Sequence, residues 1–381
     1  MIEMSRIGQK VVRRRCQHCD REYDREYVTR CRTCSGLVEI EYDLSSVSFY
    51  DSDVTSQRFA DLLPVESPEN LLFLGEGGTP CHHAEELGAS IGLDRLYLKV
   101  ESTNPTGTTK DRMAAIVLSM FKDLGVREFV SSSTGNSSTA LARGIGEYPE
   151  FKMHLYVGGA FRNRVRHADG NPDIIVHSLE GRNFTEAFNY ARDEAKRSGL
   201  PFEGGFFNPG RREGLKLAFF EATEQVDTPI RWYFQAVSSA MGLYGTWKGA
   251  KELLALDRIP VPPRLVCVQQ ESCCPMVRAY EEGSLEIEER HIVHNPAGIA
   301  KAILRGDPSG CYPFVHDAVR ESGGTFVAVS ESEILEAKAR LKEMEDLDSG
   351  YCGSATVAAV AKLAARGRIP RQDTVLLNLT D

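Results

Sequence analysis

One lysine stands in a setting that could give its amine a chemical role. Lys110 lies in NPTGTTKDRMAA, residues 104–115, behind three threonine hydroxyls and a glycine and ahead of an apolar helical stretch. Small hydroxyls and a flexible glycine can surround an amine in a ligand pocket, where it acts as a nucleophile or a base. An ordinary helix N-terminus with a solvated lysine gives the same pattern. Other loops of the chain help to choose between these interpretations.

A second loop predicts a binding site for an anion such as a carboxylate. It starts after the apolar run REFV and passes through SSSTGNSSTALARG, residues 131–144, into an alanine-rich helix. Hydroxyls and backbone N–H groups at a helix N-terminus attract negative charge, and the helix dipole adds to this attraction. The alternative is a helix cap with more hydroxyls than it needs.

A third loop predicts either a phosphate site or a tight turn between a strand and a helix. In QAVSSAMGLYGTWKGAKEL the expected strand runs into Ser238, Ser239, Ala240, Met241 and Gly242, and a helix follows. Small residues let the backbone close around a phosphate at the helix N-terminus. No Gly-Lys-Ser/Thr follows, so this is not a nucleotide-binding loop of the Walker type. A lysine, a carboxylate loop and a phosphate loop in this order fit a pyridoxal phosphate enzyme that acts on an amino acid.

Four of the ten cysteines predict a small zinc ribbon. They form two CxxC turns, Cys16/Cys19 and Cys31/Cys34, separated by a short hairpin-like insert. Two such turns can present four thiolates to one tetrahedral ion, and a closed site of this kind is structural rather than catalytic. The alternative is a ribbon that has lost its ion. The remaining six cysteines are scattered, which is typical of small buried residues in a reducing compartment.

The elements that must position these loops belong to a parallel α/β fold. Short apolar runs such as RLYLKV, RWYFQAV and TVLLNL alternate with helical patterns, and Ser330 and Glu333 form a capping-box pattern before one of these helices. In parallel sheets, ligands bind where loops leave the carboxyl ends of the strands. The net charge of −9 argues against a nucleic-acid surface, and no apolar run approaches the ~20 residues that cross a membrane. We expect a cytoplasmic enzyme that binds neither nucleic acid nor membrane.

The loops together resemble those of the threonine synthase family, within fold type II of the pyridoxal phosphate enzymes. NPTGTTKDR is similar to the family's Asn-Pro-Thr-Gly-Ser-Phe-Lys-Asp-Arg. STGNSS resembles the loop that holds the substrate carboxylate, and NPGRREGLK matches the pattern Asn-Pro-x-Arg-x-Glu-Gly-x-Lys. LLNLTD resembles the terminal Leu-Thr-Gly motif. The resemblance covers nearly the whole chain, including the cysteine ribbon.

The resemblance implies a role for each matched residue. Lys110 is the Schiff-base lysine and, once released, the base that takes the Cα proton. Asn136 contacts the 3-hydroxyl of the cofactor, and Thr380 meets its pyridine nitrogen. The cofactor phosphate is assigned to Ser238, Ser239, Ala240, Met241 and Gly242. The substrate is assigned to Ser133, Thr134, Gly135, Ser137, Arg211 and Lys216, and the second phosphate also to Arg162, Arg164 and Arg166, unless these three form a solvated basic edge.

The expected architecture has two parallel-sheet α/β domains behind the ribbon. The ribbon occupies residues 1–45, a large cofactor-binding domain residues 46–115 and 207–381, and a small domain residues 116–206. The implied reaction converts O-phospho-L-homoserine and water to L-threonine and phosphate, and a homodimer is expected. Thr109, Met113 and Cys352 depart from the family pattern. The alternative is therefore a β- or γ-replacement or elimination enzyme for another O-activated serine- or homoserine-type amino acid.

Overall fold

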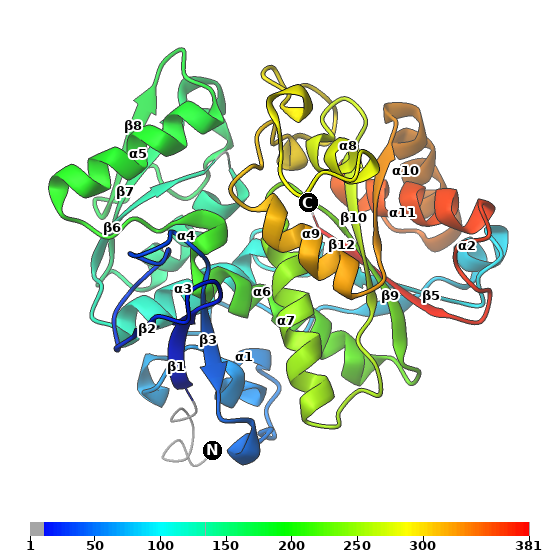
Figure 1. Cartoon of the computed structure of the whole chain (residues 1–381), viewed down its shortest axis with the longest axis horizontal. Helices are drawn as coiled ribbons and strands as arrows, with labels where there is room; N and C mark the ends of the chain where they lie inside the picture. Colours follow the sequence, from blue (N-terminus) through cyan, green and yellow to red (C-terminus); the bar gives the residue numbers. More distant parts are fainter. Residues whose placement is uncertain (1–10, 134, 381) are drawn as a thin grey trace. The chain divides into compact units, whose positions relative to one another are not determined.

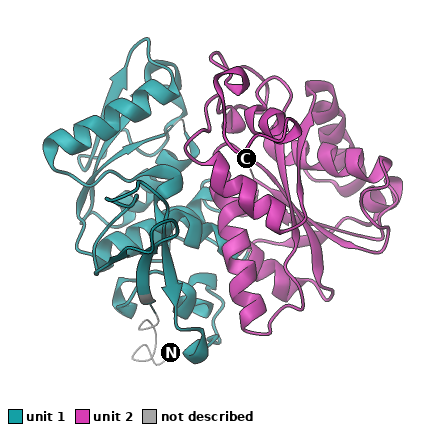
Figure 2. Ribbon diagram, viewed as in Figure 1, with its two compact units in different colours: residues 1–78, 104–106, 110–217 teal, residues 79–103, 107–109, 218–381 magenta. Residues whose placement is uncertain are grey.

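The computed structural model describes residues 11–133 and 135–380 (Figure 1). The chain forms two compact units (Figure 2). Unit 1 comprises Met1–Gly78, Asn104–Thr106 and Lys110–Leu217, and unit 2 comprises Thr79–Thr103, Gly107–Thr109 and Ala218–Asp381. Compactness alone defines these units, so the predicted boundaries of the functional domains stay a prediction.

Unit 1 contains the cysteine ribbon. Its antiparallel sheet has the order β2-β1-β3, with β1 at Val11–Cys16, β2 at Glu22–Tyr23 and β3 at Val38–Tyr42. The register pairs Arg14 of β1 with Tyr23 of β2 and with Ile40 of β3. The short helix α1, Thr55–Arg58, follows the ribbon.

A parallel three-stranded sheet of order β6-β7-β8 forms the second part of unit 1. Its strands are Glu128–Ser132 (β6), Lys152–Gly158 (β7) and Ile174–Leu179 (β8). Its helices are Lys110–Asp123 (α3), Asn136–Glu147 (α4) and Phe184–Ser198 (α5), and α6, Pro209–Gln225, begins in unit 1 and ends in unit 2. Helix α5 packs on β6 and β7 and buries alanines spaced four residues apart, as its pattern predicts.

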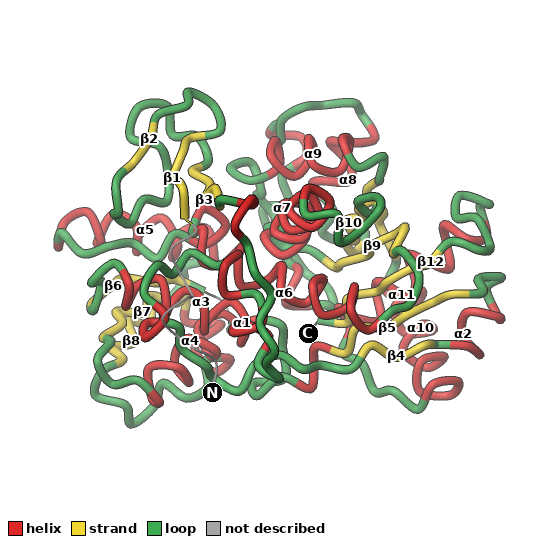
Figure 3. The backbone as a smooth tube through the Cα atoms, turned by 90° about the horizontal axis from the view of Figure 1, so that it is seen from below, coloured by secondary structure: helices red, strands yellow, loops and turns green. Residues whose placement is uncertain are grey.

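The sheet of unit 2 has the order β11-β10-β9-β12-β5-β4, and only the edge strand β4 is antiparallel. Figure 3 labels β10, β9, β12, β5 and β4 of this sheet. Its strands are Cys81–His83 (β4), Arg95–Val100 (β5), Ile230–Ala236 (β9), Arg264–Gln270 (β10), Thr325–Val329 (β11) and Thr374–Leu379 (β12). Its helices are Glu85–Ser90 (α2), Met241–Ala255 (α7), Pro275–Glu281 (α8), Tyr312–Glu321 (α9), Glu331–Glu345 (α10) and Tyr351–Ala365 (α11). The apolar runs expected as strands are therefore confirmed.

One face of this sheet forms a large hydrophobic core with α2, α10 and α11. Alternate residues of each parallel strand belong to this core, for example Leu96, Leu98 and Val100 of β5. Every residue of the central strand β12 is buried, because helices also cover the other face. The predicted capping box at the start of α10 is present: the Ser330 hydroxyl accepts from the Glu333 amide, and the Glu333 carboxylate accepts from the Ser330 amide. Of the helices described, none combines the length and the apolar character that a membrane crossing requires.

Candidate active site

The lysine loop is folded back on the helix that it enters. Helix α3 begins at Lys110, and the buried carboxylate of Asp111 accepts hydrogen bonds from the amide and the hydroxyl of Thr106, both at 2.8 Å. Gly107 has φ +83°, which allows the sharp turn between them. Lys110 is partly buried, and the Thr109 hydroxyl is buried without a hydrogen-bond partner in the described part of the chain. The loop therefore holds an amine and an unsatisfied hydroxyl on neighbouring residues.

Glycines of α6 let this helix pack closely against the backbone of α3. A Cβ on Gly214 would lie 2.4 Å from the carbonyl oxygen of Arg112, so only glycine allows this approach. Met113, which departs from the family pattern, is fully buried in the same contact region. The close packing makes the position of the Lys110 backbone depend on α6 as well as on its own loop.

The predicted carboxylate loop joins β6 to α4. Gly135 has φ 152° and ψ −88°, a conformation that only glycine adopts readily, and Asn136 is the first residue of α4. The hydroxyls of Ser131 and Ser132 are buried without partners among the described residues. Ser133 accepts a hydrogen bond from the Gly135 amide at 3.3 Å, while Thr134 lies outside the described residues. Unsatisfied buried hydroxyls beside a helix N-terminus fit a polar ligand.

Three arginines of the predicted second phosphate site have different surroundings. Arg162 pairs with Asp169, and Arg166 donates to the Thr106 carbonyl at 2.7 Å. Arg164 lies against the carboxylate loop, since a Cβ on Gly135 would be 3.4–3.6 Å from its side-chain atoms. Its Nη1 atom is buried and has no partner in residues 11–133 and 135–380.

Arg211 and Lys216, the other predicted substrate cations, are buried beside carboxylates. Arg211 forms a two-pronged ion pair with Glu203, and its Nη1 atom donates to the Ser137 hydroxyl at 3.1 Å. Asn208 also donates to Glu203, at 2.9 Å. Lys216 pairs with Glu213 on the preceding turn of α6.

Sequence reasoning missed Glu203. Its signal was an acidic residue in the otherwise apolar run PFEGGFFNP, eight positions before Arg211.

In unit 2, three neighbouring parallel strands end at candidate cofactor residues. Strand β12 lies between β5 and β9, and Thr380, which is buried, directly follows β12. The loop that follows β9 carries residues 238–240 and leads into α7 at Met241, and the loop that follows β5 leads to Thr109 and Lys110. These positions agree with ligand binding at the carboxyl ends of parallel strands.

The predicted phosphate loop opens directly into α7. Ala240 adopts a left-handed conformation with φ 58° and forms no side-chain cap for this helix. Ser239 is buried, Ser238 and Met241 are partly buried, and a Cβ on Gly242 would come within 2.6 Å of the Gln235 side chain. An uncapped helix N-terminus built on small residues fits a phosphate. Cys352 is buried in the first turn of α11, and the adjacent Gly353 packs against Leu379 at the end of β12.

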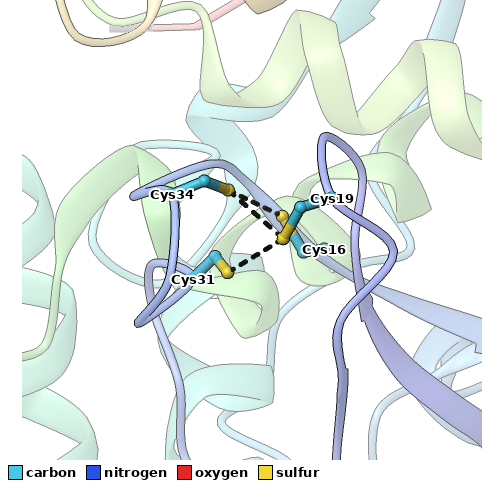
Figure 4. A group of neighbouring side chains, drawn as sticks. All are labelled: Cys16, Cys19, Cys31 and Cys34. Atoms are coloured by element: carbon cyan, nitrogen blue, oxygen red, sulfur yellow. Dashed lines mark hydrogen bonds between the residues drawn. The ribbon is translucent and has the colours of Figure 1, made fainter.

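The four ribbon cysteines converge on one point (Figure 4). Their sulfur atoms all lie within 4.8 Å of one another, and three of the pairs are 3.4–3.5 Å apart. Tetrahedral zinc with Zn–S bonds of about 2.3 Å would place sulfurs roughly 3.8 Å apart. Burial raises the pKa of Cys31, but hydrogen bonds from Tyr23 and from backbone amides outweigh it and lower this pKa to about 5. The set could therefore hold a structural zinc ion.

The residue types of each unit also fit groups of pyridoxal phosphate. Unit 1, taken by itself, has the Lys110 amine, a helix N-terminus and buried hydroxyls without partners among the described residues. Unit 2, taken by itself, has a helix start without a side-chain cap and a buried threonine after β12. These are the donors that a ring bearing an aldehyde, a hydroxyl and a phosphate requires.

Comparisons with known proteins agree with this fit. The family described as "Pyridoxal-phosphate dependent enzyme" matches residues 72–381. A threonine synthase of Methanosarcina acetivorans is 32% identical over 371 residues, covering 95% of this chain and 89% of the relative. A threonine synthase of Methanocaldococcus jannaschii is 30% identical and covers 95% and 90%. A cysteate synthase of Methanosarcina acetivorans is 26% identical and covers 96% and 90%.

Solved structures confirm the predicted fold class. Threonine deaminase isoform 2 of Solanum lycopersicum, in its processed form, superposes with a TM-score of 0.65 at 17% identity, covering 87% of this chain and 90% of that one. Maize serine racemase superposes with a TM-score of 0.64 at 16% identity, covering 79% and 87%. The chain therefore belongs to the pyridoxal-phosphate dependent enzymes of fold type II, as a member of the threonine synthase family.

Proposed function

We propose that the protein is a threonine synthase-like lyase that converts O-phospho-L-homoserine and water to L-threonine and phosphate. The observation that carries the proposal is the setting of Arg164. Its buried Nη1 atom has no partner among the described residues, and its side chain lies against Gly135 in the loop at the start of α4. A guanidinium in that position can bind a substrate phosphate while the helix N-terminus binds the carboxylate. The threonine synthase relatives support threonine as the product.

In this proposal each candidate residue has a defined task. Lys110, Asn136, Thr380 and residues 238–242 hold the cofactor, which supplies an electron-accepting ring for reactions at the substrate Cα. Ser137 accepts from Arg211, so its own O–H remains able to donate to the substrate carboxylate. The Lys110 amine takes the Cα proton as general base, and Arg164 binds the departing phosphate. Departure of the phosphate from Cγ also requires loss of a Cβ proton. Water then adds at Cβ, and Cγ and Cα each gain a proton to give L-threonine.

A second candidate function rests on the ion pairs of Arg211 and Lys216. Both predicted phosphate cations are already beside buried carboxylates, Glu203 and Glu213. A substrate dianion would have to compete with these pairs, whereas an uncharged leaving group would not. This favours β- or γ-replacement on another O-activated serine- or homoserine-type amino acid, and the cysteate synthase relatives support a reaction other than threonine synthesis.

A parallel substrate assay separates the two functions. O-phospho-L-homoserine, O-phospho-L-serine and the two O-acetyl analogues are offered at equal concentration, and products are identified by mass. Threonine from O-phospho-L-homoserine, with kcat/KM reduced at least about 100-fold in Arg164→Ala, is the expected result for loss of a charge-assisted phosphate contact. Turnover of only a serine derivative or an acetyl ester would overturn the proposal in favour of the second function. The predicted cytoplasmic location and homodimer stay predictions.

A further inference from the structure

The cysteine ribbon contacts the segment that carries the candidate substrate residues of α6. This segment, residues 203–216, is called the substrate arm here because it contains Glu203, Arg211 and Lys216. Both the ribbon and the arm belong to unit 1. Their contacts use hydrogen bonds, close packing and aromatic faces.

Two hydrogen-bonding contacts fix the arm to the ribbon, one at its first residue, Glu203, and one at Arg212. The Tyr27 hydroxyl donates to the carbonyl oxygen of Glu203 at 2.5 Å. The fully buried Arg212 donates to the Val38 carbonyl in β3 at 2.8 Å and to the Phe206 carbonyl within the arm at 2.6 Å. Because Arg211 and Arg212 are adjacent in α6, the contact with β3 also fixes the helical turn that carries Arg211.

Packing closes the remaining space between the ribbon and the arm. A Cβ on Gly204 would lie 2.4 Å from the Thr29 side chain, so this close contact between the arm and the ribbon requires glycine at position 204. The Arg30 guanidinium lies 3.3 Å from the ring centre of Phe207. Tyr27, Thr29 and Arg30 all lie between the two CxxC turns, in the part of the chain that a metal ion would close.

The ribbon has little core of its own. Its buried cluster contains Cys16, Tyr23, Val28, Cys31 and Val38, and two of these are cysteines of the metal set. A module of this size folds mainly through its metal, so the free energy of metal binding is also the free energy that orders residues 16–38. That order extends to the arm through Tyr27 and β3.

We propose that the metal-loaded ribbon positions the substrate arm, so that the order of Arg211, and through it of Ser137, depends on metal occupancy. Tyr27 and Arg212 are then positioning residues. The ribbon acts on substrate recognition and leaves the phosphate loop of unit 2 unchanged. The link to substrate recognition rests on the proposed function, whereas the link between the ribbon and the arm does not.

Hydrogen exchange on the holoenzyme, read by mass spectrometry, tests the link without any substrate. The probe is a zinc chelator, and the measured peptides cover residues 16–38, 203–216 and 238–255. Chelation should deprotect the ribbon and the arm together, by at least about tenfold, while the peptide of the phosphate loop stays unchanged. A deprotected ribbon beside an unchanged arm would overturn the proposal.

Tyr27→Phe tests the contact with the metal still bound. The ring keeps its edge-on contact with Phe121, at 4.9 Å between centroids, and only the hydroxyl is lost. A hydrogen bond of about 1 kcal/mol corresponds to a roughly fivefold loss of protection in residues 203–216. Tyr148→Phe is the matched control, because its hydroxyl also donates to a backbone carbonyl, that of Phe73, at 3.2 Å.

A failure of this proposal can be distinguished from a failure of the proposed function. Zinc content is measured in each sample, and an arm whose exchange matches the wild type in Tyr27→Phe overturns the proposal. If O-phospho-L-homoserine is turned over, Tyr27→Phe should raise its KM about fivefold with little change in kcat, while Tyr148→Phe should not. Equal KM values in the wild type and Tyr27→Phe would contradict the substrate side of the proposal.

Discussion

The buried pair between Arg211 and Glu203 allows a stability prediction that its geometry supports quantitatively. The two side chains are 3% and 1% exposed, and the carboxylate meets two nitrogens of the guanidinium. Removing one partner of such a pair leaves an uncompensated buried charge, at a cost of about 3–5 kcal/mol. Glu203→Gln keeps one oxygen that can accept from Arg211. We therefore expect the low end, about 3 kcal/mol in the free energy of unfolding of unit 1.

A double-mutant cycle measures the interaction itself. Glu203→Gln, Arg211→Met and the double variant should show a coupling of at least about 2 kcal/mol, because the double variant leaves neither charge buried alone. The matched control is Glu26–Arg32, which is also a two-pronged pair in unit 1 but is 37% and 57% exposed. Its coupling should stay below about 1 kcal/mol.

The assay must report on unit 1 specifically. Both tryptophans, Trp232 and Trp247, lie in unit 2, so their fluorescence does not report on the unfolding of unit 1. The slowest-exchanging amides of β6 and β7 supply the free energy of unfolding instead. A coupling below about 0.5 kcal/mol for the buried pair would refute the reasoning, since it would mean that the two charges do not interact in solution.

The other predictions concern the cofactor, the metal and pH. Purified protein should absorb near about 410 nm, and this band should be lost in Lys110→Ala; a wild type that stays colourless after addition of pyridoxal phosphate would contradict the assignment. Metal analysis of reduced protein should find one zinc ion per chain, and Cys19→Ser together with Cys34→Ser should lower this content, whereas Cys81→Ser should not. Burial raises the pKa of Glu76 from 4.5 to about 7. The folded chain therefore keeps this proton to higher pH than the unfolded chain, and unit 1 should lose up to about 3 kcal/mol of stability between pH 4.5 and 7. Glu76→Gln should remove that slope in urea unfolding at a series of pH values, and an unchanged slope would assign it to other groups.

Features that depend on neighbouring residues could be predicted from the sequence. The apolar runs became strands because a strand buried on both faces needs a continuous apolar pattern, as TVLLNL in β12 shows. The capping box of Ser330 and Glu333 formed because its partners are three residues apart. The CxxC spacing likewise predicted four converging thiols. The roles of the individual site residues remain proposals based on their motifs.

Only the tertiary structure decided which charged side chains pair with each other and which can still bind a ligand. Arg162, Arg164 and Arg166 look alike in the sequence, yet one pairs with Asp169, one donates to Thr106, and Arg164 keeps a buried nitrogen without a partner among the described residues. Arg211 contacts Ser137 across 74 positions of sequence, and the ribbon contacts the substrate arm across 176. Periodicity and capping are set by residues within a few positions of each other. The partner of a buried charge is set by which distant side chains packing brings into the same water-free space.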